Sequence, residues 1–225
     1  MMTLSGKRIL VTHADDFMGP AICSNLSAKG AEVIADADPL TATDAPEHLI
    51  QNCGQVDILV ANLSIKAPTT PATQISDEEW QETFSRLVDP LPRLCKAVLP
   101  QMIERQAGKI IVVGSAAALR GMKRTATYSA ARGAQLAYTQ ALGVEVARHN
   151  IQVNAIAQNF VDNPTYFPAE IQADERFQAR LQREVPLGRL VSADEDVEFI
   201  AYLCSDAANC FVGQVFPMCG GWVTR

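Results

Sequence analysis

Strand and helix signals alternate along the whole chain, and this alternation constrains the fold more than any other feature. Short apolar runs typical of buried strands occur at 8–12, 31–36, 56–62, 108–118, 151–157 and 213–221. Helical patterns lie between and after them, at 19–29, 43–52, from 76 onward, and at 90–105, 125–149, 170–183 and 193–205. Nearly continuous apolar strands separated by helices predict a parallel sheet covered on both faces. No repeat, low-complexity tract or linker interrupts the pattern, so we expect a single doubly wound, Rossmann-like α/β domain over residues 1–225.

One helix start is marked by a capping pattern. Ser76 precedes "DEEW", and Glu79 follows it by three residues. A serine and a glutamate at this spacing can each satisfy a backbone N–H of the first turn. The pattern predicts a helix that begins at Ser76 with a complete capping box.

Composition and charge exclude several classes of function. The 225 residues carry a formal net charge of −6, which disfavours nucleic acid and anionic membranes as partners. The six cysteines are scattered, with no pair at zinc-ligand spacing, and we expect no metal site. No run approaches the ~20 apolar residues of a membrane span, and the N-terminus lacks the pattern of a signal peptide. We therefore expect a cytoplasmic protein with a small-molecule site.

The turn after the first strand has the shape of a dinucleotide-binding turn without most of its glycines. The stretch "THADDFMG" carries His13 and Phe17 where glycines would let a pyrophosphate approach the backbone, and it keeps only Gly19. An aromatic ring at position 17 would fill that space. We expect no cofactor to bind here.

Three further residues could handle a proton at the carboxyl end of the sheet, where ligands of this fold bind. Ser115 follows the fourth strand, and Tyr128 and Arg132 are four apart on one helix face. A guanidinium favours phenolate over phenol and can lower the pKa of a neighbouring tyrosine, and a serine hydroxyl can hold a substrate oxygen. A tyrosine and an arginine at this spacing can equally be a packed surface pair.

The chain resembles the short-chain dehydrogenase/reductase superfamily over nearly its whole length. The motifs behind this resemblance are "VDILVAN", "VLPQM", "GKIIVVGSAAA", "YSAAR", "IQVNAIA" and "GQVFPMCGGW". Four cofactor contacts of the superfamily are altered, however. They are the turn glycines, the motif after the third strand ("ANLS"), the Pro-Gly after the fifth strand (here Gln158 and Asn159), and the catalytic lysine (here Arg132). The catalytic asparagine is also replaced, by "RLVDP" near 87.

The combination is similar to the halohydrin dehalogenases, the branch of that superfamily that works without a cofactor. The resemblance implies that Tyr128 removes the hydroxyl proton of a vicinal haloalcohol, Arg132 lowers the pKa of Tyr128, and Ser115 orients the substrate oxygen. The alkoxide would close an epoxide and expel halide. The halide would leave into a pocket formed by Phe17 and residues of the segment after the fifth strand, namely Gln158, Asn159, Phe160, Val161, Tyr166 and Phe167. In reverse, azide, cyanide or nitrite would open epoxides. The resemblance also implies a homotetramer.

Two other functions remain open from the sequence. A nicotinamide-dependent dehydrogenase with an unusual turn is supported by Gly19 and the Ser/Tyr pair. A catalytically silent ligand-binding protein is disfavoured by the intact set of Ser115, Tyr128 and Arg132. The aromatic residues after the fifth strand could simply pack as a lid, and Trp222 could lie at a subunit contact. His13 and Asp36 are expected to play no catalytic part.

Overall fold

The structure is a computed structural model that describes residues 3–224, and its centre is one six-stranded parallel sheet in the order β2-β1-β3-β4-β5-β6. The strands are β1 (Arg8–Val11), β2 (Glu32–Ala35), β3 (Ile58–Ala61), β4 (Gly108–Ser115), β5 (Ile151–Gln158) and β6 (Val215–Met218). The predicted α/β fold class is confirmed. The strands at 56–62 and 213–221 are shorter than the apolar runs that predicted them.

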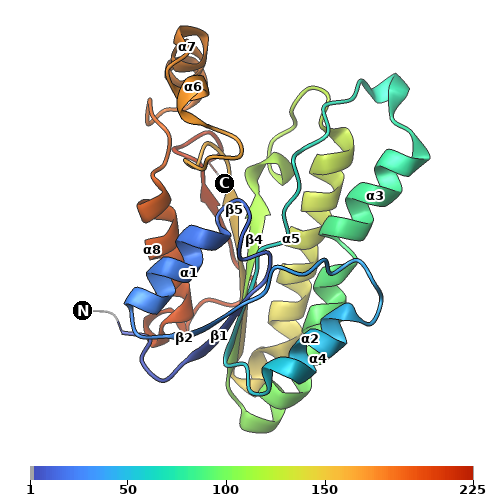
Figure 1. Ribbon diagram of the computed structural model, residues 1–225, viewed down its shortest axis with the longest axis vertical. Helices are drawn as coiled ribbons and strands as arrows, with labels where there is room; N and C mark the ends of the chain where they lie inside the picture. The colour runs from blue at the N-terminus through green and yellow to red at the C-terminus, as the bar shows by residue number, and fades with distance from the viewer. Residues whose placement is uncertain (1–2, 225) are drawn as a thin grey trace.

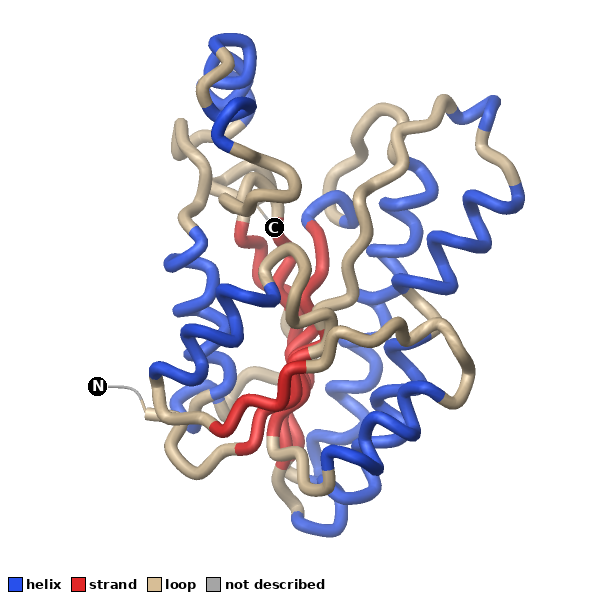
Figure 2. Tube along the Cα trace, viewed as in Figure 1, coloured by secondary structure: helices blue, strands red, loops and turns tan. Residues whose placement is uncertain are grey.

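Helices cover both faces of the sheet. The main helices are α1 (Gly19–Ala28), α2 (Ala45–Cys53), α3 (Asp77–Leu87), α4 (Pro90–Arg105), α5 (Ala126–Val146), α6 (Ala169–Gln172), α7 (Glu175–Glu184) and α8 (Ala193–Cys204). In Figure 1, α1 and α8 lie on one side of the sheet and α2, α4 and α5 on the other, while α6 and α7 project beyond the ends of the strands. Figure 2 shows the strands as a central layer between these two helical layers. None of the helices between residues 3 and 224 has both the length and the hydropathy needed to cross a bilayer.

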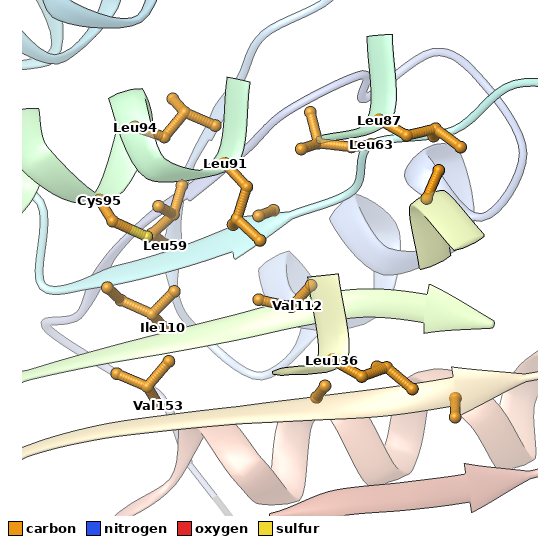
Figure 3. Packing of buried hydrophobic residues seen from close by; sticks show 14 of the residues in the cluster. Leu59, Leu63, Leu87, Leu91, Leu94, Cys95, Ile110, Val112, Leu136 and Val153 are labelled. Atoms are coloured by element: carbon orange, nitrogen blue, oxygen red, sulfur yellow. The ribbon is translucent and has the colours of Figure 1, made fainter. Parts of the chain in front are cut away.

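The buried strand residues alternate between the two faces, which is why the apolar runs are continuous. Leu10 and Leu59 belong to the core beneath α4 and α5, whereas their neighbours Ile9 and Val60 pack beneath α1 and α8. Figure 3 shows the first core, where side chains of β3, β4 and β5 meet those of α4 and α5. Residues on successive strand positions point to opposite faces, so both faces must be apolar when both carry helices.

The strand order places the functional residues at one edge. The chain leaves β1 for β2 on one side and then crosses to β3 on the other, so the topological switch point lies between β1 and β3. All strands run parallel, and their carboxyl ends therefore meet at the same edge. Ser115 and Gln158 are register partners at the ends of β4 and β5. This pairing brings the first proton-handling residue next to the segment after β5.

Two local predictions differ from the structure. The predicted helix at 170–183 is two helices, because the Asp174 side chain accepts the N–H groups of Arg176 and Phe177 and starts α7 anew. Ser76 does cap α3 by accepting the N–H of Glu79 at 3.2 Å. The capping box is incomplete, however, because the Glu79 carboxylate accepts hydrogen bonds from Thr70 and Thr127 instead.

Candidate active site

A cavity of about 120 Å³ lies at the carboxyl ends of β4 and β5. Every site residue expected from the sequence lines this cavity. Those ten lining residues are Phe17, Ser115, Tyr128, Arg132, Gln158, Asn159, Phe160, Val161, Tyr166 and Phe167. Six more residues line the same space: Met18, Ser64, Ala67, Gly114, Met122 and Asn163. The residues come from four separate parts of the chain, so only the fold brings them together.

Ser115 ends β4 with its hydroxyl oriented by the following turn. Its Oγ accepts the backbone N–H of Ala117 at 3.2 Å. The Ser115 hydroxyl proton remains available for another acceptor, because that contact uses only a lone pair of the oxygen. Ser115 can therefore donate a hydrogen bond to an oxygen bound in the cavity.

Arg132 lies one helical turn after Tyr128, with its guanidinium 5.1 Å from the centre of the Tyr128 ring. Its Nη1 donates to the carbonyl oxygens of Leu63 and Val113 and to Oε1 of Gln135, at 2.9, 3.1 and 2.9 Å. These bonds fix the guanidinium against the ends of β3 and β4. Arg132 is only 4% exposed, and its Nε has no hydrogen-bond partner among the described residues. A buried cation thus lies beside the Tyr128 ring.

Tyr166 is the second tyrosine of the cavity, and its hydroxyl is bonded to two backbone groups. It accepts the N–H of Ala67 at 2.9 Å and donates to the carbonyl of Ile65 at 3.1 Å. Burial, followed by the charge of neighbouring Tyr128, raises the pKa of Tyr166 above its usual value. Tyr166 therefore stays neutral and ties the segment after β5 to the loop after β3, which leaves Tyr128 as the candidate base.

The turn after β1 keeps a glycine-like backbone although it carries large side chains. His13 and Phe17 have φ angles of 45° and 50°, a region that non-glycine residues rarely adopt. The Phe17 ring packs 5.4 Å from the Tyr166 ring. A dinucleotide pyrophosphate needs backbone without side chains at these positions, and this turn does not fit one.

Gly19 is required by the turn itself. A Cβ at position 19 would lie 2.4 Å from the carbonyl oxygen of His13, closer than any packing can absorb. Asn62 braces the same turn, because its Nδ2 donates to the His13 carbonyl at 3.0 Å. The close approach of the turn backbone therefore explains Gly19 without a cofactor.

Aromatic side chains form the wall of the cavity. Phe160 is 2% exposed, adopts a φ of 52° and lies 6.1 Å from the rings of both Phe167 and Trp222. Trp222 is 5% exposed and its carbonyl accepts a hydrogen bond from Arg120. Trp222 thus packs within its own chain and supports Phe160.

The amide groups of Gln158 and Asn159 are oriented by specific bonds. Asn159 Oδ1 accepts the N–H of Phe160 at 3.0 Å, which identifies the other terminal atom as nitrogen. That Nδ2 is buried and has no partner among residues 3–224. Gln158 Nε2 donates to Oδ2 of Asp196 at 2.6 Å. The N–H of Phe160 is already used, whereas Asn159 Nδ2 is a buried donor of this segment without a partner among residues 3–224.

Several polar residues near the first turn lie outside this cavity. His13, Asp15, Asp16 and Arg86 line a separate cavity of about 430 Å³. Burial, followed by the charge of Arg86, lowers the pKa of His13. Burial also raises the pKa of Asp36 to about 6, with a smaller contribution from Asp38. No group of three or more His, Cys, Asp or Glu side chains in the described part of the chain could hold a metal ion.

Sequence reasoning missed the contributions of the loop after β3. Ser64 lines the cavity, Leu63 supplies an acceptor for Arg132, and Ile65 and Ala67 hold Tyr166. The available signal was position, because this loop follows a strand at the switch point. Its contacts use mostly backbone atoms, so residue types alone could not reveal them.

Comparisons with known proteins agree on the superfamily and differ on the reaction. A family model described as "Enoyl-(Acyl carrier protein) reductase" matches residues 6–223. The 3-oxoacyl-(acyl-carrier-protein) reductase FabG of Salmonella typhimurium is 31% identical and that of Pseudomonas aeruginosa 32%, with 98% of each chain covered in both cases. A solved structure described as "Dehalogenation enzyme" is 32% identical with a TM-score of 0.91, covering 99% of this chain and 100% of that one. The chain belongs to the short-chain dehydrogenase/reductase superfamily of enzymes.

Proposed function

We propose that this enzyme is a halohydrin dehalogenase that converts vicinal haloalcohols to epoxides without a cofactor. The observation that carries the proposal is the composition of the cavity. It combines Ser115 and Tyr128, which can handle an alcohol, with Phe17 and Tyr166, whose rings pack together beside them. In a dehydrogenase of this superfamily the nicotinamide needs that region. The 32% identity to a structure described as a dehalogenation enzyme supports the same reaction.

In the proposed reaction Ser115 donates a hydrogen bond to the substrate hydroxyl, and the Tyr128 phenolate removes its proton. The oxygen then attacks the adjacent carbon and forms the new C–O bond. The carbon–halogen bond breaks with its electron pair, which leaves as halide. The products are one epoxide, one halide and one proton, which passes from Tyr128 to water. Arg132 lies over the ring and stabilises the phenolate that this step requires.

The departing halide would occupy the space between Phe17 and the segment after β5. Aromatic ring edges are electropositive, and Asn159 Nδ2 is a donor without a partner among the described residues. A large, weakly hydrated anion needs partial charges of this kind and no full countercharge. The same pocket would admit azide, cyanide or nitrite for epoxide opening. We also propose that the enzyme acts as a homotetramer.

The second candidate function is a nicotinamide-dependent reductase. It is favoured by the 31% identity to the FabG reductases and by the retained Ser115 and Tyr128. It is disfavoured because His13 and Phe17 stand where the pyrophosphate would approach. Gly19, which supported this candidate from the sequence, is explained by the close approach of the turn backbone at His13 and Ala14.

Two assays on the purified enzyme separate the candidates. We expect chloride release from 1,3-dichloro-2-propanol without added nucleotide, and no binding of NADPH or NADH by calorimetry. Absence of halide release across vicinal chloro- and bromoalcohols, together with micromolar NADPH binding, would favour the reductase.

A further inference from the structure

The most deeply buried side-chain carboxyl group among residues 3–224 lies directly behind the proposed anion pocket. Asp196 is fully buried near the start of α8. Its Oδ2 accepts the 2.6 Å hydrogen bond from Gln158 Nε2, and Gln158 lines the cavity. Its Oδ1 has no partner among residues 3–224. A buried carboxyl with one unsatisfied oxygen is costly, although its place in the first turn of α8 favours a negative charge.

We propose that Asp196 is a positioning residue of the anion pocket: it holds the Gln158 amide in place, and its negative charge weakens halide binding so that the product halide can leave. This inference rests on the proposed function. The hydrogen bond fixes which amide atom of Gln158 faces α8. The carboxylate also places a negative charge behind Gln158, which lines the pocket. Water screens this buried charge little. A departing halide is thereby attracted by ring edges and Asn159 but repelled from behind.

The ionisation of Asp196 falls in the range where the effect can be measured. Burial raises the pKa of Asp196 to about 7, and the hydrogen bond from Gln158 opposes this only in part. The carboxyl is therefore neutral in mildly acidic solution and charged in mildly alkaline solution. Halide binding is expected to weaken as the pH rises through this value.

Most of the other ionisable groups on and around α8 are paired or exposed, and the buried Cys204 thiol of α8 has its pKa raised by burial to about 12. On α8, Glu195 pairs with Arg189 and Glu198 with Lys29, and Asp194 is exposed. Two elements that pack against α8 carry ionisable side chains. In α1 this is Cys23, and in β4 it is Lys109, which is bonded to Asn209. The short helix after α8 (Asp206–Ala208) has Asp206, paired with Lys7, and β5 presents the uncharged Gln158. A pH effect that disappears with the Asp196 carboxylate can therefore be assigned to it.

The test is the affinity for bromide of the full-length enzyme, measured by calorimetry at pH 5.5 and pH 8.5. The variants are Asp196→Asn, which can still accept the bond from Gln158, and Asp196→Leu, which cannot. Asp194→Asn removes an exposed carboxylate from the same helical turn and is the matched control. Thermal unfolding of each variant checks that the fold is retained.

We expect wild type and Asp194→Asn to bind bromide roughly tenfold more weakly at pH 8.5 than at pH 5.5. Asp196→Asn should bind equally at both pH values, with the affinity of wild type at pH 5.5. Asp196→Leu should also lose the pH dependence and bind more weakly than Asp196→Asn, because Gln158 is no longer held. The same pH dependence in Asp196→Asn as in wild type would overturn the inference but leave the proposed function standing. Absence of bromide binding to wild type would overturn the anion pocket and the inference together.

Discussion

The replacement of Phe17 by glycine separates the role of its ring from the strain of its backbone. The ring lines the cavity and packs 5.4 Å from Tyr166, and the backbone has a φ of 50°. Glycine adopts this φ freely and would recover about 1–2 kcal/mol of strain. Loss of the aromatic pair removes about 0.5–1.5 kcal/mol, and loss of the half-buried ring about 1–2 kcal/mol more.

These opposing effects predict a small change in stability and a large change in anion binding. The net destabilisation of Phe17→Gly should be about 0.5–1.5 kcal/mol, which corresponds to a fall in Tm of roughly 1–6 °C for a chain of this size. Phe17→Ala is the matched control, because it removes the ring but retains the strained Cβ, and it should be less stable than Phe17→Gly. Both variants should bind bromide several-fold more weakly than wild type, since the electropositive ring edge is gone.

The assay combines differential scanning fluorimetry with bromide inhibition of chloride release. Neither variant should gain NADPH-dependent reductase activity, because His13 and the segment after β5 are unchanged. Wild-type bromide inhibition in both variants would refute the assignment of Phe17 to the anion pocket. Reductase activity in Phe17→Gly would show that the ring merely blocks a functional cofactor site.

Three further predictions concern the base, its cation and the buried carboxyl. Tyr128→Phe should fold normally and lose about 10²–10⁴-fold in kcat for chloride release, and retained activity would rule out Tyr128 as the base. Arg132→Lys keeps a charge but cannot reproduce the bonds to the Leu63 and Val113 carbonyls. Because the phenolate base is then less stabilised, kcat should fall and the ascending limb of the pH–rate profile should move to higher pH. An unchanged profile would argue against the role of the guanidinium. Burial raises the pKa of Asp196 from its ordinary value of 3.8 to about 7 in the folded enzyme. Between about pH 4 and 7 the folded state therefore binds more protons than the unfolded state, and the free energy of unfolding falls as the pH rises through this interval. The free energy of unfolding of Asp196→Asn, measured by urea denaturation, should therefore increase relative to wild type across that interval, and a constant difference would contradict the burial argument.

The fold and the reactive residues were predictable because each depends on the type of residue at a position that the sequence pattern marks, within a strand or at its end. Continuous apolar strands between helices predicted the parallel sheet, and Ser115, Tyr128 and Phe17 lie at or after strand ends, where ligands bind in such sheets. The structure brings all ten expected site residues to one cavity. Their chemical roles stay predictions until activity is measured.

The remaining parts of the site depend on contacts between segments far apart in the chain. Asp196 lies 38 residues after Gln158, and only the packing of α8 onto the sheet brings the two together. The bonds of Tyr166 to Ile65 and Ala67 use backbone atoms, which carry no residue signature. Glu79 matched a capping box in sequence, but hydroxyls from Thr70 and Thr127 compete successfully for its carboxylate.

The central claim is that this enzyme releases halide without a nicotinamide nucleotide. The most direct measurement follows chloride, epoxide and acid together when the purified enzyme reacts with 1,3-dichloro-2-propanol, with and without added NADPH. We expect one chloride and one proton for each epoxide formed, at a rate that NADPH does not change. Absence of chloride release under both conditions, or release that requires NADPH, would contradict it.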